Sequence, residues 1–308
     1  MAKKPAQPTL SVERQQQFTY YWYAAKQAIV EERFDDALVL LEFCQQINPN
    51  DGTTLNMLGI IYDALRQQDR ALDFFKRAYE ADPRDQWYHY SNALLSLQTE
   101  DSQRQAQEVL ERSYKINPKD ENLLEQLRRL YVAEREWKKC LKIQDRIDEL
   151  KGYDVYSAFN RSHAYSMMRK PKKALKEIDK YLEEDATNIN FLLYRLDILE
   201  RHNMSLEERY KTYEQILSYT SGNMAVLNNY AWLLATHGGD LRKAEMMSMK
   251  TIQEEPNNPV FLDTYAWILH LQGKDDLAQF YLQKALWNAT PETKSEIEKH
   301  IKMINQHK

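Results

Sequence analysis

Apolar residues recur along this chain at helical spacing, in pairs of stripes separated by a polar turn. The clearest pair lies in residues 52–85. Its first stripe is Leu55, Leu58 and Tyr62, and its second is Ala71, Phe75 and Ala78. Spacings of three and four residues place each stripe on one face of a helix. Pro83 then ends the second helix, because proline lacks an N–H group and disfavours helix at the preceding residue.

Prolines that close such pairs recur at a fixed period. Pro83 follows Pro49 by 34 residues, and Pro118 follows Pro83 by 35; Pro256 comes 138 residues, or four periods, later, and Pro291 another 35. The spacing predicts eight helix pairs, at about residues 18–51, 52–85, 86–120, 121–154, 155–188, 189–223, 224–258 and 259–292. A closing helix with a polar face is predicted at 293–306, as a stacked array needs at its end. We expect one domain over 12–308, after a flexible leader at 1–11.

This pattern resembles the tetratricopeptide repeat (TPR) family. Its repeats carry a large residue at position 4, Leu-Gly at 7–8, Tyr at 11, Ala at 20, Phe at 24, Ala at 27 and Pro at 32. Residues 52–85 fit at every place, with Leu55, Leu58, Gly59, Tyr62, Ala71, Phe75, Ala78 and Pro83. The resemblance implies an all-α fold, a right-handed superhelical α-solenoid of antiparallel helix pairs. Residues 121–223 match less closely, and their register is left open.

Composition argues against an enzyme. Seven glycines in 308 residues predict few turns with positive φ and no phosphate-binding glycine loop. The seven histidines lack metal-ligand spacing, and no nucleophile elbow, Walker loop or Rossmann fingerprint is present. Cys44 and Cys140 fall at small-residue positions of their repeats, where a free cysteine packs as a small apolar residue. We therefore predict no catalysis, no cofactor and no metal.

The resemblance also implies where a partner binds. In TPR proteins, repeat positions 2, 5, 9, 12 and 13 face the concave groove, and position 6 carries Asn in several peptide-binding members. The candidate groove residues are Trp22, Lys26, Asn56, Trp87, Tyr90, Tyr156, Phe159, His163, Asn228, Asn229, Trp232 and Trp267. Aromatic rings can hold apolar anchors of a peptide, and Asn amides can pair with its backbone. The competing interpretation of each ring is packing between repeats.

We therefore expect a non-catalytic scaffold that captures a protein or peptide segment in its groove. An assembly module that uses convex or end surfaces, including self-association, is the alternative, and an RNA-binding helical repeat is a weaker one. The net charge of −4 and the lack of a basic residue recurring at position 2 predict no nucleic-acid partner. No apolar run is long enough to span a membrane. The first residues lack a signal peptide's apolar segment, which fits a soluble cytoplasmic protein or a periplasmic one whose signal peptide has been removed. Partner, pathway and oligomeric state stay open.

Overall fold

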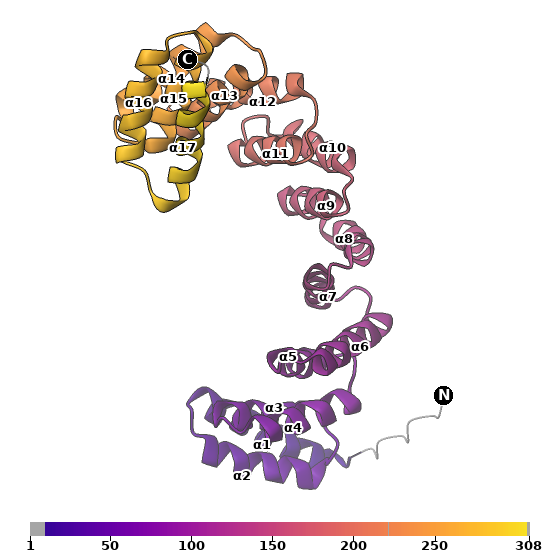
Figure 1. Cartoon of the computed structure of the whole chain (residues 1–308). Coiled ribbons are helices and arrows are strands. Elements are labelled where there is room, and N and C mark those ends of the chain that lie inside the picture. The colour runs from indigo at the N-terminus through magenta and orange to yellow at the C-terminus, as the bar shows by residue number, and fades with distance from the viewer. Residues whose placement is uncertain (1–9, 221, 307–308) are drawn as a thin grey trace. The chain divides into compact units, whose positions relative to one another are not determined.

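The computed structural model describes residues 10–220 and 222–306, and this part of the chain contains seventeen α-helices and no strand (Figure 1). The predicted all-α repeat fold is confirmed. Backbone contacts divide the chain into two compact units, residues 1–164 and 165–308, with the boundary inside one helix. The expectation of a single continuous domain stays a prediction.

The first unit consists of successive helix pairs. Its helices are α1 (Val12–Val30), α2 (Phe34–Ile47), α3 (Gly52–Ala64), α4 (Gln68–Ala81), α5 (Trp87–Ser96), α6 (Glu100–Ile116), α7 (Glu121–Ala133), α8 (Trp137–Lys151) and most of α9 (Val155–Met167). Of the predicted leader, residues 1–9 lie outside the described residues. Ser11 already caps α1, its side chain accepting a hydrogen bond from the Arg14 N–H at 3.4 Å.

The second unit repeats this arrangement and closes with an unpaired helix. Its helices are α10 (Pro171–Leu182), α11 (Ile189–Arg201), α12 (Leu206–Tyr219), α13 (Met224–Thr236), α14 (Leu241–Glu254), α15 (Pro259–Leu271), α16 (Asp275–Trp287) and α17 (Pro291–Gln306). From the second repeat onward, the first helix of each pair begins within one residue of the predicted repeat start. The apolar stripes of paired helices form the core of each unit.

Most repeats begin with the same N-cap. The residue before the first helix is Asp51, Asp120, Asn188, Asn223 or Asn258, and its side-chain oxygen accepts a backbone N–H of the first turn. This bond satisfies one of the donors that a helix leaves unpaired at its start. The third repeat differs, because Gln86 makes no side-chain cap bond to α5.

The turn inside each helix pair contains one residue with positive φ. In six turns this residue is not glycine, and the set is Glu32, Arg66, Gln98, Arg135, Arg169 and Asn203. Gly238 and Gly273 take the same place in the last two repeats. The following N–H often bonds the carbonyl five residues earlier, as Gln67 bonds Tyr62 at 2.8 Å, which is the helix-ending Schellman arrangement. The expectation that few glycines mean few positive-φ turns is therefore wrong.

Candidate functional site

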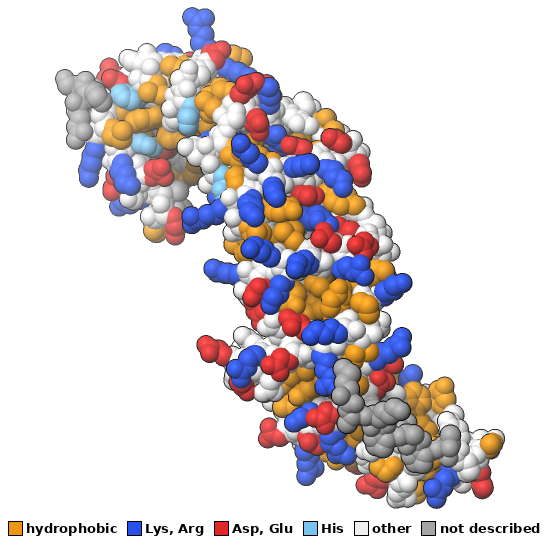
Figure 2. Space-filling view, turned by 90° about the vertical axis from the view of Figure 1, so that its right-hand side faces the viewer, with side chains coloured by type: hydrophobic (Ala, Val, Ile, Leu, Met, Phe, Trp, Pro, Cys, Tyr) orange, Lys and Arg blue, Asp and Glu red, His pale blue; other side chains and the backbone are white. Residues whose placement is uncertain are grey.

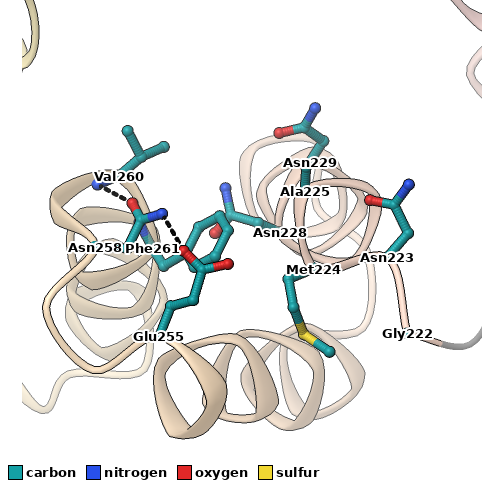
Figure 3. A pocket seen from close by; sticks show the side chains of 10 residues that line it. All are labelled: Gly222, Asn223, Met224, Ala225, Asn228, Asn229, Glu255, Asn258, Val260 and Phe261. Atoms are coloured by element: carbon teal, nitrogen blue, oxygen red, sulfur yellow. Dashed lines mark hydrogen bonds between the residues drawn. The ribbon is translucent and has the colours of Figure 1, made fainter.

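An open pocket lies between the N-terminal ends of α13 and α15 in the second unit (Figure 3). Its volume is about 580 Å³. It is lined by Gly222, Asn223, Met224, Ala225, Asn228, Asn229, Glu255, Asn258, Val260 and Phe261. We call it the asparagine pocket, because four of these ten residues are asparagines.

Two of the asparagines shape the pocket by capping its helices. The side-chain oxygen of Asn223 accepts the Val226 N–H at 3.1 Å and fixes the start of α13. Asn258 does the same for α15, accepting the Val260 N–H at 3.1 Å, and its amide nitrogen donates to the Glu255 carboxylate at 2.9 Å. The side-chain oxygens of both residues, and the amide nitrogen of Asn258, are thus engaged in holding the walls. Our sequence prediction missed both, although an Asn directly before an apolar stripe is a recognisable cap signal.

Asn228 differs from the capping asparagines. Its side chain points from α13 toward Phe261 of α15 and is only 2% exposed (Figure 3). The Oδ1 atom is buried and has no hydrogen-bond partner among the described residues. A buried acceptor without a donor costs about 1–3 kcal/mol, so each such group calls for an explanation. Next to it, Asn229 is exposed. The pocket therefore combines an unpaired buried acceptor with an accessible amide.

One helical turn further along α13 and α15 lies an aromatic cluster, which we define as Trp232, Trp267, His270 and His300. The ring centroids of Trp232 and Trp267 are 6.3 Å apart, and the His300 ring lies 5.6 Å from the first and 4.6 Å from the second. Both tryptophans are half-buried. His300 belongs to α17, and our sequence prediction did not include it. The signal was present, since Ile297, His300 and Ile304 form a stripe at spacings of three and four.

Trp22 and Lys26 lie on α1 and Asn56 lies on α3, at the start of the first unit. The Trp22 indole nitrogen donates to Thr53 Oγ1 at 3.0 Å, which connects α1 to α3. The Lys26 ammonium lies 5.6 Å from the centre of the Trp22 ring. Asn56 is half-buried, and its Oδ1 is buried without a partner among the described residues. Asn56 and Asn228 both occupy repeat position 5, so the unpaired acceptor recurs in the two units.

Trp87 and Tyr90 lie in the core and not on a groove. Their exposed fractions are 3% and 7%. The Trp87 indole donates to Asp120 Oδ2 at 3.2 Å, and the Tyr90 ring lies 5.6 Å from that of Tyr79. Both belong to one apolar cluster with the side chains of α4, α6, α7 and α8. The expectation that they anchor a partner thus gives way to the packing interpretation.

Tyr156, Phe159 and His163 on α9 remain accessible to different degrees. Tyr156 is 72% exposed and Phe159 is 47% exposed. His163 is half-buried, with its ring centroid 6.0 Å from that of Phe159 and 5.7 Å from that of Trp137. Phe159, His163 and Trp137 thus form a connected group of rings in the first unit, and Tyr156 is exposed on the same helix as the first two.

Both cysteines are buried and unpaired, and burial raises the pKa of the Cys44 thiol to about 11 and also raises that of Cys140. Within residues 10–220 and 222–306, no three His, Cys, Asp or Glu side chains cluster as metal ligands would.

The helices in these ranges include none that is both long and apolar enough to cross a membrane. On the face drawn in Figure 2, Lys and Arg side chains stand among Asp and Glu side chains.

Comparison with known proteins supports the repeat assignment. The sequence profile of the tetratricopeptide repeat matches residues 53–85, the second predicted repeat. Among curated protein sequences, none is significantly similar to this chain.

Solved structures resemble the fold over most of the chain. A structure of Naa15/Naa10 bound to HypK-THB matches 92% of this chain with a TM-score of 0.68 and 14% identity. This chain spans only 46% of that one. The C-terminal part of a TPR repeat-containing protein from Cytophaga hutchinsonii matches 79% of this chain, with 98% of its own length covered, a TM-score of 0.57 and 13% identity. At such identities the likeness concerns the fold alone.

Proposed function

Because this chain is a tetratricopeptide-repeat protein, we propose that it is a non-catalytic scaffold that captures a peptide segment of a protein partner on the face formed by α13 and α15. Stacked helix pairs of this kind serve in general as protein-interaction surfaces. The observation that carries the proposal is Asn228, which lines the open asparagine pocket and whose buried Oδ1 has no hydrogen-bond partner among the described residues.

The chemistry of the pocket selects the ligand. Asn228 Oδ1 requires a hydrogen-bond donor, and the N–H of an extended peptide is a donor of the right size. Asn229 presents both a donor and an acceptor beside it. Met224, Val260 and Phe261 supply apolar surface for a side chain. The Glu255 carboxylate at the rim disfavours an anionic ligand. We therefore infer an extended, uncharged segment whose backbone pairs with the asparagines and whose apolar side chain enters the pocket.

A displayed library of random 12-residue peptides, selected on the full chain, tests this proposal. Selected peptides should bind the Asn228→Leu variant about tenfold or more weakly, because a leucine cannot accept a hydrogen bond. The same variant should melt at or above the wild-type temperature, since it removes an unsatisfied buried acceptor.

Asn122→Ala, on the exposed side of α7, is the matched control and should leave binding unchanged. The proposal fails if no peptide is selected, or if the selected peptides bind Asn228→Leu as tightly as wild type.

Self-association is a second candidate function, favoured by the solvent-facing side of α16. Leu277, Phe280 and Trp287 lie on one stripe of this helix and are 53%, 62% and 90% exposed. Contiguous exposed apolar side chains commonly mark interaction surfaces. Sedimentation equilibrium of wild type against Phe280→Ser/Trp287→Ser tests this role: a concentration-dependent dimer lost in the variant supports it, and a monomeric wild type excludes it.

A further inference from the structure

The chain's own C-terminal helix covers the part of the α13 and α15 face that adjoins the asparagine pocket. His300 of α17 contacts both Trp232 and Trp267 through its ring. Its Nδ1 lies 2.8 Å and 3.0 Å from the two carboxylate oxygens of Asp263 on α15. His300 is 8% exposed and Asp263 is 9% exposed. Side chains of α17 therefore occupy the surface on which we expected a partner to sit.

A narrow stripe attaches α17. Among residues 291–305, only Ile297, His300 and Ile304 are buried. Ile297 and Ile304 join an apolar cluster with side chains of α15 and α16. At the margin, Gln279 of α16 donates to Asn305 at 2.7 Å. A helix with so few buried groups is among the less stable parts of a repeat array and can open without the rest unfolding.

We propose that α17 is a displaceable internal ligand of this face, which an amphipathic partner helix of the same pattern replaces. The pattern is an apolar residue, a histidine or basic residue three positions later, and an apolar residue four positions after that. The middle residue must be a histidine or a basic residue, because the helix that sits on this face buries the Asp263 carboxylate. A buried carboxylate needs a hydrogen-bond donor.

This proposal rests on the proposed function in one respect: both concern binding to the face formed by α13 and α15. Asn228 and Trp232 are four residues apart on α13, which corresponds to about 6 Å along the helix axis. A partner segment held in the asparagine pocket would thus meet α17 at the tryptophans. Opening of α17 would then expose a helix-binding surface at the aromatic cluster, next to the site for an extended segment at the pocket.

The test compares three forms of the full chain with one probe. The probe is a fluorescein-labelled synthetic peptide of residues 290–306, followed by anisotropy. The released form is Ile297→Ser/Ile304→Ser. The locked form is Gln279→Cys/Asn305→Cys joined by a short bismaleimide cross-linker. Cys44 and Cys140 are buried with raised thiol pKa values, so they react slowly, and wild type treated with the cross-linker serves as control.

The peptide should bind the released form about tenfold or more tightly than wild type, where the attached α17 competes at high effective concentration. It should not bind the locked form. Asp263→Asn in the released form should weaken binding about tenfold. Equal binding to all three forms, or no binding to a released form that keeps its wild-type helix content by circular dichroism, overturns the proposal.

Hydrogen exchange keeps the test decisive if the released form does not fold. In wild type, amides of α17 should exchange about tenfold or more faster than those of α15, and the cross-link should remove this difference. Equal protection of the two helices overturns the proposal. Asn228→Leu should leave binding of the 290–306 peptide unchanged while weakening library peptides, so failure of this inference is distinguishable from failure of the proposed function.

Discussion

Helices α5 and α9 carry aromatic residues at the same predicted repeat positions, but these residues are buried in α5 and exposed in α9. Trp87 and Tyr90 of α5 are 3% and 7% exposed, whereas Tyr156 and Phe159 of α9 are 72% and 47% exposed. Both pairs lie in the first unit. Residue type and predicted position therefore do not decide which rings are available to a partner.

Register explains the difference. The positive-φ residue of each turn is a better reference than the predicted start of the repeat, because it fixes where the first helix ends. Trp87 lies eleven residues before Gln98, as the buried Leu55 lies before Arg66. Tyr90 likewise corresponds to the buried Leu58.

Counted in the same way, Tyr156 and Phe159 fall beside the core stripe of α9. Helix α5 spans only Trp87–Ser96 and lacks a side-chain cap. It is shorter than the first helices of the other repeats. Trp87 and Tyr90 therefore lie two residues nearer to their turn than Tyr156 and Phe159 do, at positions that face the core.

The largest expected effect separates the two helices directly. Trp87→Ala should destabilise the first unit by about 3–5 kcal/mol, because it leaves a cavity in the core. Tyr156→Ala should change stability by less than about 0.5 kcal/mol, since the ring packs on little. Urea unfolding followed by far-ultraviolet circular dichroism measures both. Similar losses in the two variants would contradict the burial that distinguishes α5 from α9.

A smaller effect tests the core layer that Trp87 joins. A methyl group on Gly59 would lie 2.4 Å from Cε1 of Phe75, and Phe75 belongs to the same apolar cluster as Trp87. Gly59→Ala should therefore cost about 1–3 kcal/mol through overpacking. Gly222→Ala, where the added methyl meets nothing within 4 Å, is the control. Equal unfolding midpoints for these two variants would show that the Phe75 ring moves aside without lowering the free energy of unfolding.

Changes at the turns that set the register should be smaller again. Arg135 has φ of 58° and Gly273 has φ of 76° at equivalent places. Because a side chain disfavours this backbone region, Arg135→Gly should stabilise by up to about 1 kcal/mol, and Gly273→Ala should destabilise by about 1 kcal/mol. Thermal unfolding of both variants measures the shifts. The same sign for both changes would mean that the turns are not equivalent.

The smallest expected effect is a pH dependence that arises from His89 on α5. Burial lowers the pKa of His89, against a weaker opposing influence of Asp63, and its ring stacks on Phe75 at 5.2 Å. The folded state thus binds protons less readily than the unfolded chain, whose histidine pKa is about 6.5. The stability contributed by neutral His89 should be fully present above that pH and should fall as pH drops toward the folded pKa. Urea unfolding at several pH values should show a shallower decline in His89→Phe, and an identical decline would exclude His89 as the cause.

The local pattern was sufficient for the helix pairs. The apolar stripes around Leu55 and Phe75 and the proline period gave the architecture, because stripe spacing and helix-ending residues act over a few positions. The sequence predicted only part of the candidate site. Asn228 and Asn229 line the pocket, and Trp232 and Trp267 lie beside it. Trp87 and Tyr90 were misplaced, because a shortened helix changes which face is buried without changing the residues on it.

The sequence by itself determined that this protein is an array of helix pairs with amide and aromatic side chains on their first helices. Only the tertiary structure decided which acceptors stay unpaired, as at Asn228, and which rings are covered, as at Trp267 by His300. The physical reason is the distance along the chain between the residues that interact. Helix periodicity is set by neighbours three and four residues apart, whereas the contact of α17 with α13 joins residues far apart in the chain.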